Sequence, residues 1–227
     1  MRARPNQSRA YRSVVAVAAP IMYRWGRMRV TGAELIPECG PVLLAADHDS
    51  YWDPMAIAVA ARDRRQICAL AKSSLWKNRV LATFMTRMGQ IPIERGASNV
   101  KAVDAAVAAL RDGAVIGIFP EGTRSLGRVL RARSGIGRLA QLVPEAAVVC
   151  VRTNGTTDVV RAPKRPQITV EFFLPSGGGI GSDETPAAFA QRLLDEIRAG
   201  APVETPGRAK AAAKYAGTSA AGDRTAG

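Results

Sequence analysis

The chain has 227 residues, of which 47% are hydrophobic and 5% aromatic, and this suits one α/β domain with a sizeable core rather than a fibrous or wholly disordered protein. Its formal net charge of +13 predicts a polyanionic partner: nucleic acid, an anionic membrane surface or phosphorylated small molecules. Three widely spaced cysteines and a single histidine argue against a disulfide framework and a structural zinc site, and they fit the reducing cytosol.

The first 29 residues form a basic segment with an apolar stretch. Seven arginines precede the first acidic residue, Glu34, and the apolar run from Val14 to Tyr23 is ten residues long. Such a run is too short to cross a bilayer, and it lacks the cleavage site of a secretory signal. Its apolar side chains recur at helical spacing, so we expect an amphipathic helix that lies in a membrane interface, packs on its own domain, or does both.

Strand and helix patterns then alternate, which predicts a single α/β domain with a mostly parallel or mixed central sheet flanked by helices. The domain should span residues 30–203, and residues 204–227 lack apolar periodicity and are expected to form a disordered tail. The predicted elements are strands at 41–46, 66–71, 90–93, 114–119, 147–151 and 167–173 and helices at 54–61, 75–88, 99–111, 136–142 and 186–197.

His48 lies in the turn between the first predicted strand and the helix at 54–61. Histidine is the one side chain that titrates near neutrality when unperturbed, so His48 is the candidate general base of this chain. Asp53 precedes Pro54, where it suits a helix N-cap, and the same carboxylate can hold an imidazole N–H. The alternative for His48 is an ordinary hydrogen-bonded histidine without a catalytic role.

The run Phe119–Ser125 forms a glycine-containing turn directly after a buried strand. Gly122 allows a backbone N–H to approach a ligand closely, Thr123 offers a hydroxyl, and Arg124 supplies a planar guanidinium that matches a phosphate. By itself the run also fits an ordinary turn with a capping threonine. Residues 93–96 repeat the pattern of strand, charge and glycine, which favours a ligand site.

In order and spacing, these blocks resemble the glycerolipid acyltransferases of the 1-acylglycerol-3-phosphate acyltransferase family. That family has a histidine and an aspartate separated by four residues, a block that ends in arginine and glycine, the run Phe-Pro-Glu-Gly-Thr-Arg-Ser, and a buried strand near a glycine. The matching positions here are His48 with Asp53, residues 89–96, residues 119–125 without change, and more loosely residues 148–156. The resemblance spans roughly residues 30–175.

Three positions depart from the family pattern. Asp47 stands where the family usually has asparagine, Asp49 where it often has a neutral or basic residue, and Cys150 where it has proline. We expect these departures to leave the chemistry intact and to bear on which acyl acceptor is used.

The resemblance implies transfer of a fatty acyl group from acyl-CoA or acyl carrier protein to the free hydroxyl of a lysophosphatidic acid, giving phosphatidic acid in phospholipid biosynthesis. His48 would be the base and Asp53 would orient it, with no bound cofactor and no metal. The alternatives are the same chemistry on glycerol-3-phosphate or another lysolipid, and a catalytically inert membrane-binding module.

The acceptor phosphate is then expected to bind Arg95, Gly122, Thr123 and Arg124, whereas Glu121 of the same turn should hold the turn or an arginine in place.

Other basic residues, Lys72, Arg128 and Arg133, are expected to meet the thioester carrier or the membrane. Basic residues near an anionic leaflet contribute about 1 kcal/mol each, so we expect a monotopic or peripheral protein on the cytoplasmic face of the cell membrane, not a secreted one. Nucleic acid is not expected as a partner, because the basic residues are not interleaved with aromatic ones.

Overall fold

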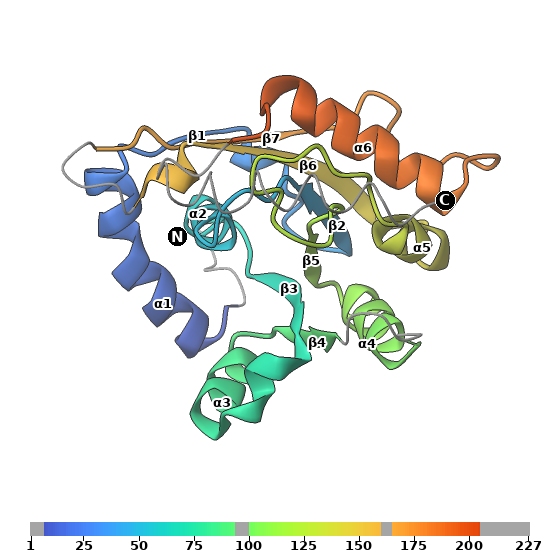
Figure 1. The fold of residues 1–227 in the computed structure, drawn as a ribbon. Helices are drawn as coiled ribbons and strands as arrows, with labels where there is room; N and C mark the ends of the chain where they lie inside the picture. Colours follow the sequence, from blue (N-terminus) through green and yellow to red (C-terminus); the bar gives the residue numbers. More distant parts are fainter. Residues whose placement is uncertain (1–6, 94–99, 160–164, 205–227) are drawn as a thin grey trace, which may run out of the picture.

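The computed structural model describes residues 7–93, 100–159 and 165–204, and a seven-stranded sheet forms its centre. The strands are β1 (Arg29–Thr31), β2 (Val42–Ala46), β3 (Ile67–Lys72), β4 (Ile91–Ile93), β5 (Val115–Ile118), β6 (Ala147–Asn154) and β7 (Thr169–Phe173). Their order is β1-β7-β6-β2-β5-β3-β4, and only the pair β6 and β7 is antiparallel (Figure 1). The predicted α/β domain with a mixed sheet is confirmed.

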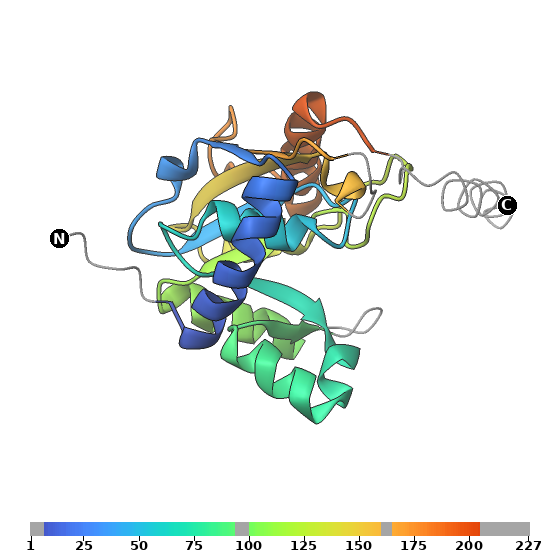
Figure 2. The ribbon, with the colours of Figure 1, turned by 90° about the vertical axis from the view of Figure 1, so that its left-hand side faces the viewer.

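Helices cover both faces of this sheet (Figures 1 and 2). They are α1 (Arg9–Pro20), continued by a π-helical turn (Ile21–Trp25), α2 (Asp53–Ala60), α3 (Arg79–Arg87), α4 (Val100–Arg111), α5 (Gly135–Leu142) and α6 (Pro186–Gly200). Short 3-10 turns occur at Ala33–Leu35, Ser73–Lys77 and Thr156–Asp158. The side chains of α1 and α2 pack in one apolar cluster, and those of α4, α5 and α6 pack in another.

Strand β2 is buried along its whole length because it contributes to both clusters. Leu44 and Ala46 point towards α1 and α2, whereas Leu43 and Ala45 point towards α4, α5 and α6. Successive side chains of a strand alternate between the two faces, so a strand covered on both sides needs an unbroken apolar run. This explains why residues 41–46 are all apolar.

The N-terminal helix α1 packs on its own domain along one side. Tyr11 and Val15 are buried, and the Tyr11 hydroxyl accepts a hydrogen bond from the N–H of Ile67 at 3.4 Å. Burial raises the pKa of Tyr11, because the ionised phenolate would lose its hydration. Val17 on the same helix is 73% exposed. The expected packing on the domain is therefore present, and one side of the amphipathic helix stays open.

Two predicted helices differ from the structure. The helix predicted over residues 75–88 is wrong as one element, because Asn78 interrupts it and caps α3 by accepting from the N–H groups of Val80 and Leu81. The helix predicted over 186–197 continues to Gly200. The additional turn carries Arg198, whose contacts are described below.

The predicted tail lies outside the described residues except for Glu204. Its carboxylate accepts from the Gly155 N–H at 2.6 Å and from the Thr157 hydroxyl at 2.7 Å. Within the described ranges, none of the helices combines the length and apolar character that a bilayer crossing requires.

The contact between α5 and α6 generates a stability prediction at Gly137. A Cβ atom at Gly137 would lie 2.1 Å from the carbonyl oxygen of Pro186, so Gly137→Ala forces the two helices apart. Overpacking of this kind costs about 1–3 kcal/mol, and we expect that loss in the free energy of unfolding measured by chemical denaturation.

Gly135 is the matched control, because a Cβ there meets no atom within 4 Å. Gly135→Ala should leave stability unchanged or raise it by up to about 1 kcal/mol, since alanine is the better helix former. Equal losses in both variants would contradict the close packing of α5 on α6.

Candidate active site

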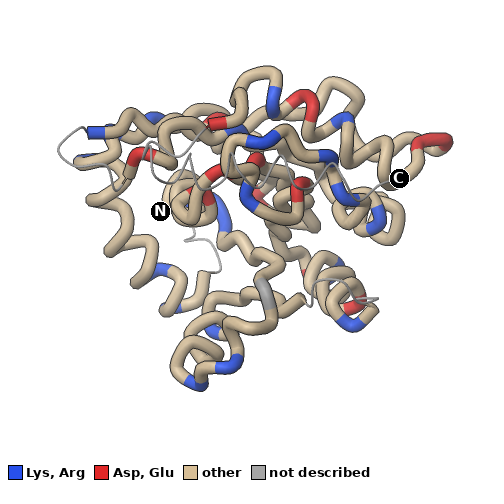
Figure 3. Tube along the Cα trace, viewed as in Figure 1, with Lys and Arg blue, Asp and Glu red and all other residues tan. Residues whose placement is uncertain are grey.

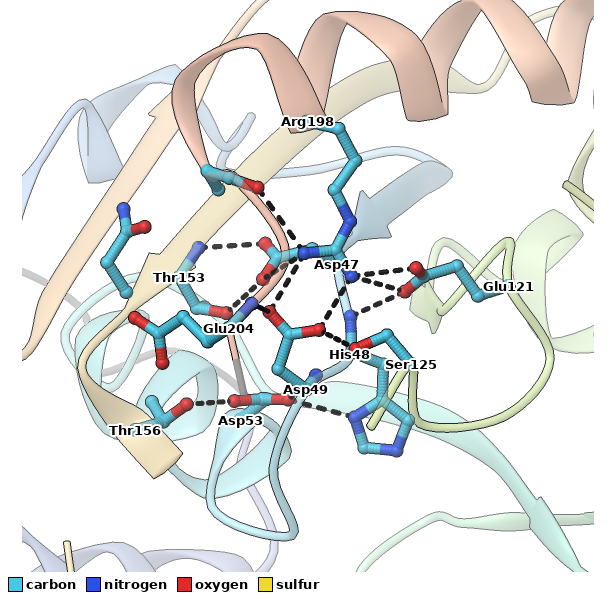
Figure 4. Close-up of polar contacts among 12 residues, drawn as sticks. Asp47, His48, Asp49, Asp53, Glu121, Ser125, Thr153, Thr156, Arg198 and Glu204 are labelled. Carbon is cyan, nitrogen blue, oxygen red and sulfur yellow. Dashed lines mark hydrogen bonds and ion pairs between the residues drawn. The ribbon is translucent and has the colours of Figure 1, made fainter. Parts of the chain in front are cut away.

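The carboxyl ends of three neighbouring strands bring distant polar residues to one edge of the sheet (Figure 4). β2 pairs in parallel with β5 and with β6, so all three end on the same side. His48 follows β2, Glu121 follows β5 and Thr156 follows β6. In α/β sheets this is the edge at which ligands bind.

His48 and Asp53 form a hydrogen-bonded pair at this edge. Nδ1 of His48 lies 2.9 Å from Oδ2 of Asp53, and the carboxylate is fully buried while the imidazole remains 17% exposed. An ionised carboxylate can only accept, so in the neutral imidazole Nδ1 carries the proton and the lone pair lies on Nε2. The ring also stacks on Phe119, with centroids 4.2 Å apart.

Asp53 holds the turn that carries His48 rather than capping the helix. The cap position is Trp52, and α2 begins at Asp53 itself. Oδ2 of Asp53 also accepts from the N–H groups of Asp49 and Ser50, both at 2.7 Å, and Oδ1 accepts from the Thr156 hydroxyl. The predicted N-cap role is therefore wrong, because the carboxylate accepts from two N–H groups of the preceding turn and from the hydroxyl of Thr156 in the 3-10 turn after β6.

The backbone of His48 is tied to the turn after β5. Its N–H donates to Oε2 of Glu121 at 2.8 Å, and its carbonyl accepts from the N–H of Ser125 at 2.7 Å. The Ser125 hydroxyl in turn donates to the carboxylate of Asp49. The two turns therefore form one hydrogen-bonded unit around the histidine.

A guanidinium that sequence reasoning missed lies beneath this unit. Arg198 donates to both oxygens of Asp49 at 2.8 Å and to both oxygens of Glu121 at 2.7 and 2.9 Å. Burial raises the pKa of Glu121 although Arg198 opposes the shift. For Arg198, burial alone would lower the pKa, but the hydrogen bonds and charges of Asp49 and Glu121 outweigh it and raise the pKa. Glu121 thus holds an arginine, as expected.

Asp47 is fully buried, as Asp53 is. It accepts from the N–H of Thr153 at 2.8 Å and from the Thr153 hydroxyl at 2.7 Å. Burial raises the pKa of Asp47 well above its usual range, and the nearby charge of Asp53 adds to the shift. The Asp47 carboxylate therefore faces β6.

An apolar cavity of about 580 Å³ opens beside the imidazole. Among the described side chains that line it, only His48, Gln90 and two tyrosines are polar. The remainder come from α1, α2, α3, the strands, the 3-10 turn before α3 and the turn after β5, and they include Val14, Met55, Ile57, Leu75, Phe84 and Met85. The volume lies in the range of ordinary small-molecule sites, and the lining suits a hydrocarbon chain.

The structure places the remaining predicted residues of the turn after β5 around the mouth of the site. Gly122 lines the cavity at φ +69°, but its N–H donates to the Phe119 carbonyl at 2.9 Å, so this N–H closes the turn. The Arg124 guanidinium lies 3.6 Å above the ring of Tyr51. Thr123, which precedes Arg124 in the chain, is half-buried.

The more distant candidates are only partly described. Arg133 packs against the α-carbon of Gly122, and the Nε of Arg128 donates to the Ser125 carbonyl at 3.1 Å. Lys72 is the last residue of β3, and Arg95 lies outside the described residues. In the described part of the chain, no cluster of three or more His, Cys, Asp and Glu side chains is arranged to hold a metal ion.

Comparisons with known proteins identify the family and the fold of this chain. The family model described as Acyltransferase matches residues 27–158, which is more than half of the chain. A crystal structure of the 1-acyl-sn-glycerophosphate (LPA) acyltransferase PlsC from Thermotoga maritima has the same fold, with a TM-score of 0.60 and 18% identity, over 84% of this chain and 78% of that one.

Curated relatives named 1-acyl-sn-glycerol-3-phosphate acyltransferase are also similar. The Bacillus subtilis protein is 27% identical over 53% of this chain and 62% of its own length. The Borreliella burgdorferi protein is 35% identical over 43% of this chain and 39% of its own length. The chain thus spans less than two thirds of the length of the curated relatives it matches.

The raised pKa of Asp47 generates a prediction on stability. A carboxyl group with a raised pKa binds more protons in the folded than in the unfolded chain, so its contribution to stability falls as the pH rises above about 3.9, its unfolded pKa. In Asp47→Asn the amide keeps an acceptor and a donor for Thr153 but cannot ionise. We expect its free energy of unfolding to fall less than that of the wild type between about pH 4 and pH 8.

Asp104→Asn, at an exposed position of α4, is the control and should follow the wild-type pH dependence. If Asp47→Asn lost stability in parallel with the wild type over that range, the buried ionisation of Asp47 would be disproved.

Proposed function

The chain belongs to the acyltransferase family, and we propose that it transfers a fatty acyl group from a thioester to the free hydroxyl of a lysophosphatidic acid. The observation that supports this most directly is the pairing of His48 with Asp53 on the wall of an apolar cavity. The donor is acyl-CoA or acyl-acyl carrier protein, and the product is phosphatidic acid for phospholipid synthesis.

In the proposed reaction His48 acts as a general base. Its Nε2 takes the proton of the acceptor hydroxyl while that oxygen attacks the thioester carbonyl. The C–O bond forms, the C–S bond breaks, and the imidazolium returns the proton to the leaving thiolate. Asp53 keeps the proton on Nδ1 and stabilises the imidazolium. A thiolate leaves readily, so no acyl-enzyme is needed.

The apolar cavity is the proposed site of the fatty acyl chain. Each buried CH₂ contributes about 0.8 kcal/mol, so a long chain in this cavity anchors the thioester beside His48. Holding the carbonyl and the base at a fixed separation converts binding into rate. This supports a long-chain rather than a short-chain donor.

The acceptor phosphate is proposed to bind at the turn after β5. Arg124 supplies a guanidinium beside Tyr51, whose ring lines the cavity, and Thr123 supplies a hydroxyl. Arg95, which lies outside the described residues, is proposed from the sequence to bind the same phosphate. Gly122 contributes by its shape, because its own N–H is already used within the turn.

We further propose that the segment 1–29 attaches the protein to the cytoplasmic face of an anionic membrane. Val17, Ile21 and Tyr23 are exposed on α1 and the turn that follows it. Arginines flank this apolar surface in sequence, which is the composition of an interfacial helix.

The first test is acyl transfer by the purified protein from a palmitoyl thioester to 1-acyl-glycerol-3-phosphate. His48→Ala should lower kcat/KM by about 10²–10⁴-fold, because the general base is lost, while circular dichroism shows an unchanged fold. The wild type should use the palmitoyl thioester in preference to the butyryl thioester, because only the longer chain fills the cavity.

Transfer to glycerol-3-phosphate or another lysolipid, but not to lysophosphatidic acid, would retain the chemistry and reject the proposed acceptor. A His48→Ala variant with full activity would reject the base. Inactivity towards every acceptor would favour an inert membrane-binding module.

Membrane attachment is tested by co-sedimentation with vesicles of phosphatidylcholine with and without phosphatidylglycerol. Val17→Asp should weaken binding to the anionic vesicles by about tenfold or more, because a carboxylate is costly to bury in the interface and repels anionic lipid. Leu174→Asp is the matched control, since Leu174 is 58% exposed directly after β7 and lies outside the segment 1–29. Equal binding by both variants would place the membrane contact elsewhere.

A further inference from the structure

Arg198 connects the last turn of α6 to both turns of the active site. It lies beyond the residues that the family model matches and outside every sequence block that carries the family resemblance. Its side chain is only 14% exposed, and Figure 4 shows it directed into the group of carboxylates next to His48. Arg198 therefore contacts the polar groups of the site from an element that carries none of the family blocks.

The guanidinium joins two loops that are far apart in sequence. Nη1 and Nη2 of Arg198 each donate to one oxygen of Asp49, and Nη2 also donates to both oxygens of Glu121. Asp49 belongs to the turn after β2 and Glu121 to the turn after β5. A planar group with several fixed donors can make these contacts together, which an ammonium cannot.

Both partners of Arg198 are linked to the backbone of His48, Glu121 directly and Asp49 through Ser125. Glu121 accepts the His48 N–H, and Asp49 accepts the hydroxyl of Ser125, whose own N–H donates to the His48 carbonyl. Hydrogen bonds therefore link Arg198, through these two partners, to the peptide groups on both sides of the imidazole.

Arg198 also supplies the counter-charge of the site. Within the described ranges it is the only lysine or arginine within ion-pair distance of Asp49 and Glu121, and it lies 3.9 Å from Asp47. Without it, those carboxylates and Asp53 would stand beside the imidazole with no cation in contact. A buried ion pair alone is weak evidence for a gain in folding stability. The contacts of Arg198 bear instead on the position and the charge of the groups around His48.

We propose that Arg198 is a positioning residue for acyl transfer, which holds the turns after β2 and β5 together and balances their negative charge beside His48. This inference rests on the proposed function only for its kinetic part. One of its two partners, Asp49, is among the departures from the family pattern.

The kinetic test compares Arg198→Met, Arg198→Lys and Arg192→Met. Arg192 is the matched control, because it lies on the same helix and pairs with Glu184 and Glu196 away from the site. Arg198→Met should lower kcat by about 10–100-fold with little change in KM, since a small displacement of a catalytic group has an effect of this size. Arg198→Lys should recover only part of kcat, and Arg192→Met should retain the wild-type value.

A second readout does not require activity. His48 is the only histidine, so in protein freed of any histidine tag its imidazole gives a single titrating set of C–H signals in the NMR spectrum. The acids around it are Asp47, Asp49, Asp53 and Glu121. Asp49 also accepts from the Glu204 N–H, and Tyr51, which contacts Arg124, lines the same cavity as His48.

Removing the guanidinium leaves net negative charge that favours the imidazolium, so the titration midpoint in Arg198→Met should move up by about half to one pH unit. Arg198→Lys should return it towards the wild-type midpoint, because the charge is restored.

The outcomes separate this inference from the proposed function. If the wild type transfers no acyl group but the midpoint shifts as expected, the function is wrong and the electrostatic role of Arg198 stands. If Arg198→Met is folded, with wild-type kcat and an unchanged midpoint, the inference is overturned. If Arg198→Met unfolds, Arg198→Lys decides: wild-type kcat and midpoint in that variant would show that any cation suffices and would overturn the proposed clamp.

Discussion

Four carboxylates lie out of water around one imidazole, and the rest of the site depends on how their charge is balanced. Asp47, Asp49, Asp53 and Glu121 are all buried, and an unpaired buried carboxylate is expensive. Each is satisfied differently: Asp53 by backbone N–H groups and His48, Asp47 by Thr153, and Asp49 and Glu121 by Arg198. These hydrogen bonds also fix the turn on which the imidazole sits.

The parallel pairing of β2 with β5 and β6 makes this arrangement possible. Residues 48, 121 and 156 are far apart in the chain, yet each follows a strand that ends at the same edge. The strands themselves are rigid because both faces of the sheet are covered by apolar helices. Short turns on a rigid edge can hold an imidazole and a carboxylate in one geometry without help from a bound ligand.

What the sequence could predict was local. The buried strand 41–46, the helix after it and the closeness of His48 and Asp53 follow from apolar runs, a proline and a spacing of a few residues. The cap was misplaced by one residue, and the Asp53 carboxylate accepts instead from two N–H groups of the preceding turn and from the distant Thr156 hydroxyl. The strand β1 was not predicted, since three residues carry no periodicity and the strand exists through its pairing with β7.

Arg198 could not be predicted for a related reason. The apolar spacing of the closing helix ends at Ile197, so the arginine after it belonged to no pattern. Its partner Asp49 is 149 residues away in sequence, and only the packing of α6 over β6 and β2 brings the two together. A pairing that depends on tertiary packing leaves no local signal in a single sequence.

The imidazole stands at the boundary between two environments that make opposite demands. On one side the cavity is apolar and suits a hydrocarbon chain, and on the other the carboxylates and Arg198 form a dense polar network. Asp53 turns Nδ1 towards the polar side, and the lone pair of Nε2 is not used by this carboxylate. A low-dielectric cavity strengthens the pull of Asp53 on an imidazolium, so the proposed base would be most effective if a bound acyl chain excluded water from the cavity. Where water is excluded, a buried carboxylate without a counter-charge is also more costly to the stability of the site. The additional aspartates, Asp47 and Asp49, and the Arg198 guanidinium of α6 therefore form one unit.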